Sequence, residues 1–166
     1  ISYATLTHIL SPMTRTQLEA IGVTDFAPDE LYPPPGVLPR SMRRHWHMQA
    51  VAAKGIQLLR DLVGAPVWVN TWAGGPGNMK ARGVRHPESA VGAQYSQHKR
   101  GLAVDFHVPS MPPADVWDLI LSEMAAFRRV GITTLEAIEA TAPDGWGWIH
   151  MDARYSTSSD LQIVYP

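Results

Sequence analysis

The spacing of hydrophobic residues along the chain predicts three helices. The longest covers residues 41–63, where apolar side chains recur at about the helical period and Gly64 stands at the end. A second helix is predicted for residues 112–131, which open with two prolines and close on Gly131. A shorter helix is predicted within residues 11–22, which end on a glycine.

Shorter apolar runs predict four strands. They cover residues 65–72, 101–108, 132–141 and 146–154, and the last two are joined by the turn sequence APDG, which is typical of a hairpin. Residues 73–94 show no period at all. Because such a long irregular segment inside a compact domain is usually functional, we expect this loop to contribute to a site.

The order of these elements predicts an α+β fold with a mostly antiparallel sheet and helices packed on one side. A length of 166 residues favours a single domain, residues 1–166. Its first part, residues 1–40, is expected to hold a helix and a proline-rich connector, and residues 41–155 form the core. Residues 28–40 contain five prolines, which predicts an extended surface segment.

Composition narrows the possible partners. The chain is 45% hydrophobic and 17% charged, as is usual for a globular protein, and its formal net charge of −1 gives no drive toward nucleic acid. No apolar run approaches the ~18 residues of a membrane span, and no secretory leader pattern is visible. Nothing in the composition sets an oligomeric state. Because the chain has no cysteine, any metal must be held by histidine and carboxylate groups.

Three side chains have the spacing of such a metal site. His98 stands just before the 101–108 strand, Asp105 lies within it, and Gly101 allows the chain to turn between them. His150 lies among apolar residues of the last predicted strand. A carboxylate inside an apolar run is costly unless it is paired or bound to a cation. Catalytic zinc sites commonly use three such protein ligands and leave one position open.

At these residues the sequence resembles the M15 zinc peptidase family. Residues 96–105, SQHKRGLAVD, resemble the family signature S-x-H-x-x-G-x-A-x-D, and residues 148–154, WIHMDAR, resemble the later motif around the third zinc ligand. The resemblance implies that His98, Asp105 and His150 bind Zn²⁺. It also implies the family fold, and hydrolysis of peptidoglycan stem peptides as a D-alanyl-D-alanine carboxypeptidase or a phage endolysin endopeptidase. Such a protein would act in the cell envelope or in a phage lysis or virion system.

The resemblance suggests two further binding residues. Ser96 would support the substrate or a ligand. An arginine in the preceding loop usually holds a substrate carboxylate in this family, and we assign this role to Arg85, with Arg82 as the alternative, because a guanidinium fork suits a carboxylate.

The general base is where the chain departs from the family pattern. Many members place a carboxylate three residues before the last zinc histidine, and here that residue is Gly147. If residues 132–141 form a hairpin strand beside His150, Glu139 faces the site, whereas a slip of one residue brings Glu136 there. Asp152, two residues beyond His150, is the third candidate, either as the base or as a group that orients a ligand.

Other residues leave further interpretations open. His107 shares the strand face of Asp105 and is a candidate transition-state donor or fourth ligand. Trp146 and Trp148 flank the site and are candidates to line a substrate groove. A second functional hypothesis is a zinc-containing structural or binding protein without hydrolysis, for example a virion component. A third is a zinc enzyme with a different substrate, because a fold alone does not set chemistry.

Overall fold

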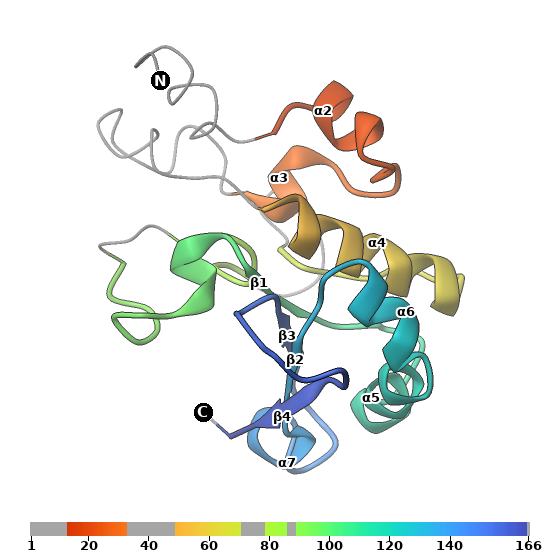
Figure 1. Ribbon diagram of the computed structural model, residues 1–166, viewed down its shortest axis with the longest axis vertical. Coiled ribbons are helices and arrows are strands. Elements are labelled where there is room, and N and C mark those ends of the chain that lie inside the picture. Colours follow the sequence, from red (N-terminus) through yellow and green to blue (C-terminus); the bar gives the residue numbers. More distant parts are fainter. Residues whose placement is uncertain (1–12, 33–48, 71–78, 86–88, 166) are drawn as a thin grey trace.

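The computed structural model describes residues 13–32, 49–70, 79–85 and 89–165 (Figure 1). At its centre lies a four-stranded sheet in the order β1–β3–β2–β4. The strands are β1 (Ala103–Phe106), β2 (Thr134–Glu136), β3 (Ile149–Asp152) and β4 (Gln162–Val164). The α+β class predicted from the sequence is confirmed.

The sheet is mixed, which corrects the prediction of a mostly antiparallel sheet. Strands β1 and β2 each pair antiparallel with β3, as expected for the central strands. Strand β4, which the hydrophobic pattern did not predict, pairs parallel with β2 at the edge of the sheet. Its residues are exposed or half-buried, so β4 lacks the buried apolar pattern that reveals a strand in a sequence.

Three helices cover the sheet. They are α4 (Ala50–Val63), α5 (Pro113–Ser122) and α6 (Met124–Arg129), and Figure 1 shows α5 and α6 next to each other beside α4. Helix α4 buries a face that includes Ile56 and Leu59 and ends at Gly64 in a left-handed conformation. Gly55 allows close contact with the side chain of Ile132, just before β2, since a Cβ there would lie 2.6 Å from its Cδ1. The predicted start of this helix at residues 41–48 lies outside the described residues.

The described residues 13–32 form two short helices beyond α4 (Figure 1). Helix α2 (Arg15–Ala20) was predicted, and it begins at a capping box in which Thr14 and Gln17 bond each other's backbone. Helix α3 (Pro28–Leu31) corrects the prediction that residues 28–40 are wholly extended. Proline is tolerated in the first turn of a helix, where its missing N–H needs no partner. Residues 33–40 lie outside the described residues.

Three other predicted elements differ in detail. The strand predicted at residues 65–72 contributes only an isolated bridge between Trp68 and His107 in its described part. The predicted 112–131 helix is divided at Glu123 into α5 and α6. The strand predicted at residues 132–141 stops at Glu136 and is followed by a helical turn, α7 (Ile138–Thr141), so the expected long hairpin does not form.

The outer edge of β1 is covered by the irregular segment that precedes it. The Asp105 amide donates to the Arg82 carbonyl at 2.7 Å, and Trp68 and His107 exchange backbone hydrogen bonds. Residues 79–85 therefore lie along β1 and bring their side chains next to Asp105. Within the described part of the chain, no helix is long and apolar enough to cross a membrane.

Candidate metal centre

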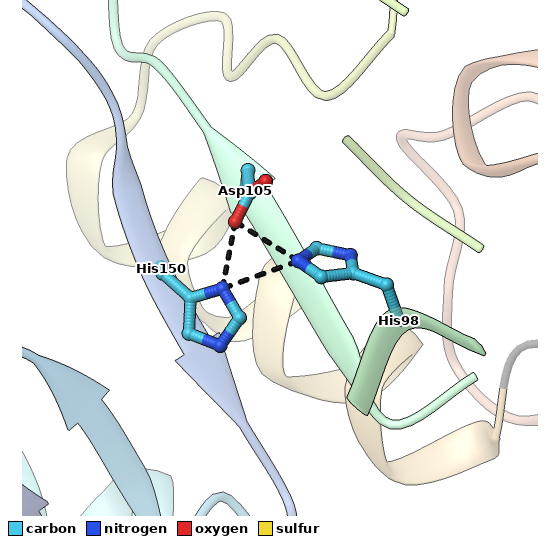
Figure 2. A group of neighbouring side chains, drawn as sticks. All are labelled: His98, Asp105 and His150. Atoms are coloured by element: carbon cyan, nitrogen blue, oxygen red, sulfur yellow. Dashed lines mark hydrogen bonds and ion pairs between the residues drawn. The ribbon is translucent and has the colours of Figure 1, made fainter. Parts of the chain in front are cut away.

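The three predicted ligands come together on β1, β3 and the turn before β1 (Figure 2). His98 lies on the 3₁₀ helix η2 (Gln97–Arg100), which ends at Gly101 with a φ of 70°, a conformation that glycine adopts without strain. The chain then enters β1, where Asp105 pairs directly with His150 of β3. The sharp turn at Gly101 thus folds His98 back over the strand that holds Asp105.

The distances between the ligand atoms fit a small metal ion. His98 Nε2 lies 3.1 Å from Asp105 Oδ1 and 3.2 Å from His150 Nδ1, and His150 Nδ1 lies 2.7 Å from Asp105 Oδ1. Metal bonds of about 2.0–2.1 Å place neighbouring ligands of a tetrahedron ~3.3 Å apart. The group is buried and can hold a metal ion, although the same side chains also form ion pairs with one another.

The two histidines present different ring nitrogens to the site, and each has a partner that explains the choice. His98 Nδ1–H donates to the Gly83 carbonyl at 2.8 Å, which leaves Nε2 free to face the site. His150 Nε2–H lies 3.2 Å from Asp152 Oδ2, which leaves Nδ1 facing the site. Partners of this kind fix the tautomer and orientation of metal-binding histidines.

Two arginines anchor the carboxylates of this centre. Arg85 Nη2 donates to Asp105 Oδ2 at 2.7 Å, on the oxygen that does not face the histidines. Arg154 binds the buried Asp152 through its guanidinium and through its backbone N–H, which donates to Oδ1 at 3.0 Å. Each predicted ligand therefore has a neighbour outside the site that holds it in place.

These contacts shift the proton equilibria of the site. Burial raises the pKa of Asp105, but hydrogen bonds from His150 and His98 outweigh it and hold the pKa well below its ordinary value. Burial lowers the pKa of His150, whereas the carboxylates of Asp105 and Asp152 raise it more strongly, to about 9. Burial also raises the pKa of Asp152, but hydrogen bonds from His150 and Arg154 outweigh it and lower the pKa to about 2. Without a metal, the centre thus carries a proton on His150.

The ligand group opens into a cavity of about 450 Å³. Its walls include the side chains of Ser96, Tyr95 and Trp148 together with all three ligands. Tyr95 and Trp148 are 77% and 40% exposed, so both aromatic rings are accessible to a bound molecule. A cavity of this size fits a small ligand or part of a larger one.

The three candidate bases lie in different positions. Glu136, at the end of β2, lines the cavity and lies near enough to raise the pKa of His150 through its charge. Glu139 is exposed in the first turn of α7 and is not among the cavity residues. Asp152 is fully buried behind His150, where both its oxygens accept hydrogen bonds.

The register that was expected to bring Glu139 to His150 is wrong. Strand β2 pairs Thr134 with Asp152 and Leu135 with Met151, and this register continues toward Glu136 and His150. Because the strand ends there and α7 begins, Glu139 is carried away from β3.

The remaining predicted residues, Arg82, His107 and Trp146, are not among the residues that line the cavity. Arg82 stacks on Trp148, with its guanidinium carbon 5.7 Å from the ring centroid. His107 is half-buried beside Trp68, and burial and the charge of Arg82 lower its pKa. Among the described residues, the ligand group consists of His98, Asp105 and His150, and His107 is not a member. Trp146 is 83% exposed.

Two contributors were missed in the sequence. Arg154 lies two residues beyond Asp152, and this charge pair on one strand face was a signal that pointed to their contact. The contact of His98 with the Gly83 carbonyl could not be predicted from the sequence, because every residue has a backbone carbonyl.

Comparisons with known proteins add no relative to this picture. No family model, curated protein or solved structure matches the chain.

Proposed function

We propose that the protein is a zinc-dependent peptidase that cleaves peptide bonds of bacterial peptidoglycan. The observation that carries the proposal is the position of Glu136, whose side chain lines the same cavity as His98, Asp105 and His150. Three metal ligands, an accessible cavity and an adjacent carboxylate are the parts that metal-assisted hydrolysis requires. The resemblance of residues 96–105 and 148–154 to the M15 peptidases supplies the class of substrate.

Zinc suits this donor set. Two imidazoles and one carboxylate are ligands that zinc accepts in catalytic sites, and the spacing of their ligand atoms matches its bond lengths. A bound zinc ion supplies a Lewis acid for the scissile carbonyl and lowers the pKa of a water molecule to ~7. His98, Asp105 and His150 would hold the ion, each oriented by its own neighbour.

Glu136 then acts as the general base. Its side chain is half-buried and lines the cavity, where a water molecule can reach it. It takes a proton from the attacking water and delivers it to the nitrogen of the leaving amine, as a carboxylate does in general acid–base catalysis. Tyr95 and Trp148 form apolar walls along which a peptide can lie.

The experiment combines a metal assay with digestion of purified peptidoglycan. We expect about one zinc per wild-type chain and none in His150→Ala. Glu136→Gln should keep its zinc while the rate of amine release falls by about 10²–10⁴. Glu139→Gln is the matched variant, and we expect it to remain active because Glu139 lies outside the cavity.

The results also separate the proposal from its rivals. A wild-type protein that binds no zinc, or a Glu136→Gln variant with full activity, would contradict it. Activity lost in Glu139→Gln alone would return the base to that residue.

A second function is favoured by Gly147. This residue occupies the position where many M15 peptidases carry a catalytic carboxylate. A protein that binds zinc but serves as a structural or binding component would bind the metal with the same three ligands and release no amine from peptidoglycan at any pH.

A further inference from the structure

We propose that Arg85 is a positioning residue that holds Asp105 so that only one of its oxygens, Oδ1, is available to the metal. The inference rests on the metal centre of the proposed function and does not depend on its substrate. It differs from the role in substrate binding that the family resemblance suggests for this arginine.

The hydrogen bonds of the guanidinium support this role. Arg85 Nη2 donates to Asp105 Oδ2 at 2.7 Å, whereas Oδ1 of the same carboxylate faces His98 and His150. Nε donates to the carbonyl of Ala81. Two of the three guanidinium nitrogens are thus already bound within the protein.

The third nitrogen, Nη1, lies close to the neighbouring loop, although Arg85 also lines the cavity. A Cβ placed on Gly92 would lie 2.8 Å from Arg85 Nη1, so the glycine allows the loop to pass close over the guanidinium. Only 12% of the Arg85 side chain is exposed. An arginine held by these contacts cannot turn its guanidinium freely to pair with a substrate carboxylate.

The backbone around Arg85 also supports its contact with Asp105. The Arg85 amide donates to the carbonyl of His98 at 3.0 Å, which ties the arginine to a second ligand. Ala81, whose carbonyl accepts from Nε, has a φ of 60°, a conformation that is strained for residues other than glycine. The chain thus keeps a strained backbone conformation at Ala81, whose carbonyl accepts the hydrogen bond from Arg85.

The contact has a consequence for coordination. A carboxylate can bind a metal through one or both oxygens. With Oδ2 bound by Arg85, Asp105 would offer a metal one ligand atom, Oδ1, beside His98 and His150.

The direction in which a substitution of Arg85 changes metal affinity separates this role from a purely electrostatic one. A positive charge beside the centre repels a metal cation, so removal of the charge alone would tighten metal binding. Loss of an outer partner that orients a ligand instead weakens metal binding, typically by about 10–100-fold. The two roles of Arg85 therefore predict opposite changes in affinity.

The test uses the full metal-free chain, Zn²⁺ in competition with a chelating indicator, and the visible absorption spectrum of bound Co²⁺. The variants are Arg85→Met, Arg85→Lys and, as a control for charge, Arg82→Met. The Arg82 charge also acts on Asp105, but its side chain does not hydrogen-bond that carboxylate. Circular dichroism and thermal unfolding check that each variant is folded.

We expect Arg85→Met to weaken Zn²⁺ binding by about 10–100-fold and to shift the Co²⁺ spectrum toward a higher coordination number. Arg85→Lys should recover part of the affinity, because an ammonium group can donate to Oδ2 but cannot also reach Ala81. Arg82→Met should leave the affinity unchanged or raise it. If Arg85→Met does not fold, Arg85→Lys must show the same direction of change.

Wild-type affinity and an unchanged Co²⁺ spectrum in Arg85→Met and Arg85→Lys would overturn the inference and return Arg85 to substrate binding. Equal losses in Arg85→Met and Arg82→Met would overturn it as well. A wild-type protein that binds neither ion would instead overturn the proposed function, so the two failures are distinguishable.

Discussion

Gly147 lies directly against the carbonyl of Thr141, so that a Cβ at Gly147 would stand only 2.0 Å from the Thr141 oxygen. Its φ of 148° is itself unfavourable for other residues. The end of α7 therefore fills the space in which a side chain at residue 147 would lie. A side chain that carries a carboxylate therefore cannot be placed at residue 147 without moving this backbone, in line with the proposal that Glu136 on β2 is the base.

We expect Gly147→Ala to lower the free energy of unfolding by about 2 kcal/mol or more, because it adds a clash with backbone to an unfavourable φ. Gly145→Ala is the matched control. Gly145 also has a positive φ of 76°, but a Cβ there meets nothing within 4 Å, so its cost should be only about 1 kcal/mol. Urea denaturation measures both values, and equal losses would show that the Thr141 contact is unimportant.

The stability of the metal-free protein should depend on pH in both directions. His150 has its pKa raised from 6.5 to about 9 by folding, so its stabilising contribution is complete below pH 6.5 and is lost as pH rises through 9. Asp152 has its pKa lowered from 3.8 to about 2, and its contribution is lost as pH falls through that range. Thermal unfolding in the presence of a chelator should therefore give the highest midpoint between about pH 4 and 6.5.

The control for this profile is His150→Asn, which removes the titrating imidazole. We expect the decline of the unfolding midpoint between pH 6.5 and 9 to become smaller in this variant. An identical alkaline decline in both proteins would mean that other groups cause it.

Metal binding should release a proton from His150 at neutral pH. In the metal-free centre the pKa of His150 is about 9, so the ring is protonated at pH 7 and must lose its proton to become a ligand. Calorimetric titration with Zn²⁺ in buffers of different ionisation enthalpy measures this release. Affinity should rise by about tenfold per pH unit from pH 7 toward 9, and an affinity independent of pH would contradict the assignment.

Asp152 should affect metal affinity without touching the metal. Its Oδ2 lies 3.2 Å from His150 Nε2, the nitrogen that faces away from the centre. Asp152→Asn weakens this contact and leaves Arg154 without its carboxylate, so we expect metal affinity to fall by about 10-fold or more. Asp160→Asn, at an exposed position, should bind metal as the wild type does. Equal affinities of the two variants would exclude an orienting role for Asp152.

The sequence predicted the grouping of His98, Asp105 and His150 better than the sheet around them. His98 and Asp105 are seven residues apart on either side of a glycine, and a short turn followed by a strand is enough to bring them together. His150 was predicted because a histidine among the apolar residues of a strand is costly without a partner, and because residues 148–154 resemble the later M15 motif.

The register of β2 could not be predicted in the same way. Residues 132–141 contain alternating apolar positions, but the segment IEAT also suits a helical turn, and tertiary packing selects the turn. A strand that ends three residues before Glu139 cannot bring that side chain to β3, whatever the local pattern favours. The parallel pairing of β4 likewise depends on a distant partner and leaves no local signal.

The wide separation of the candidate ligands in the sequence has a structural consequence as well as a chemical one. His98 and His150 are 52 residues apart, and their ring nitrogens lie 3.2 Å from each other. A metal held by both closes the intervening chain, including α5, α6 and β2, into a loop. In a protein without cysteine, such an ion acts as a removable cross-link. Chelation would remove this cross-link, so metal supply would control how firmly η2 is held to β3.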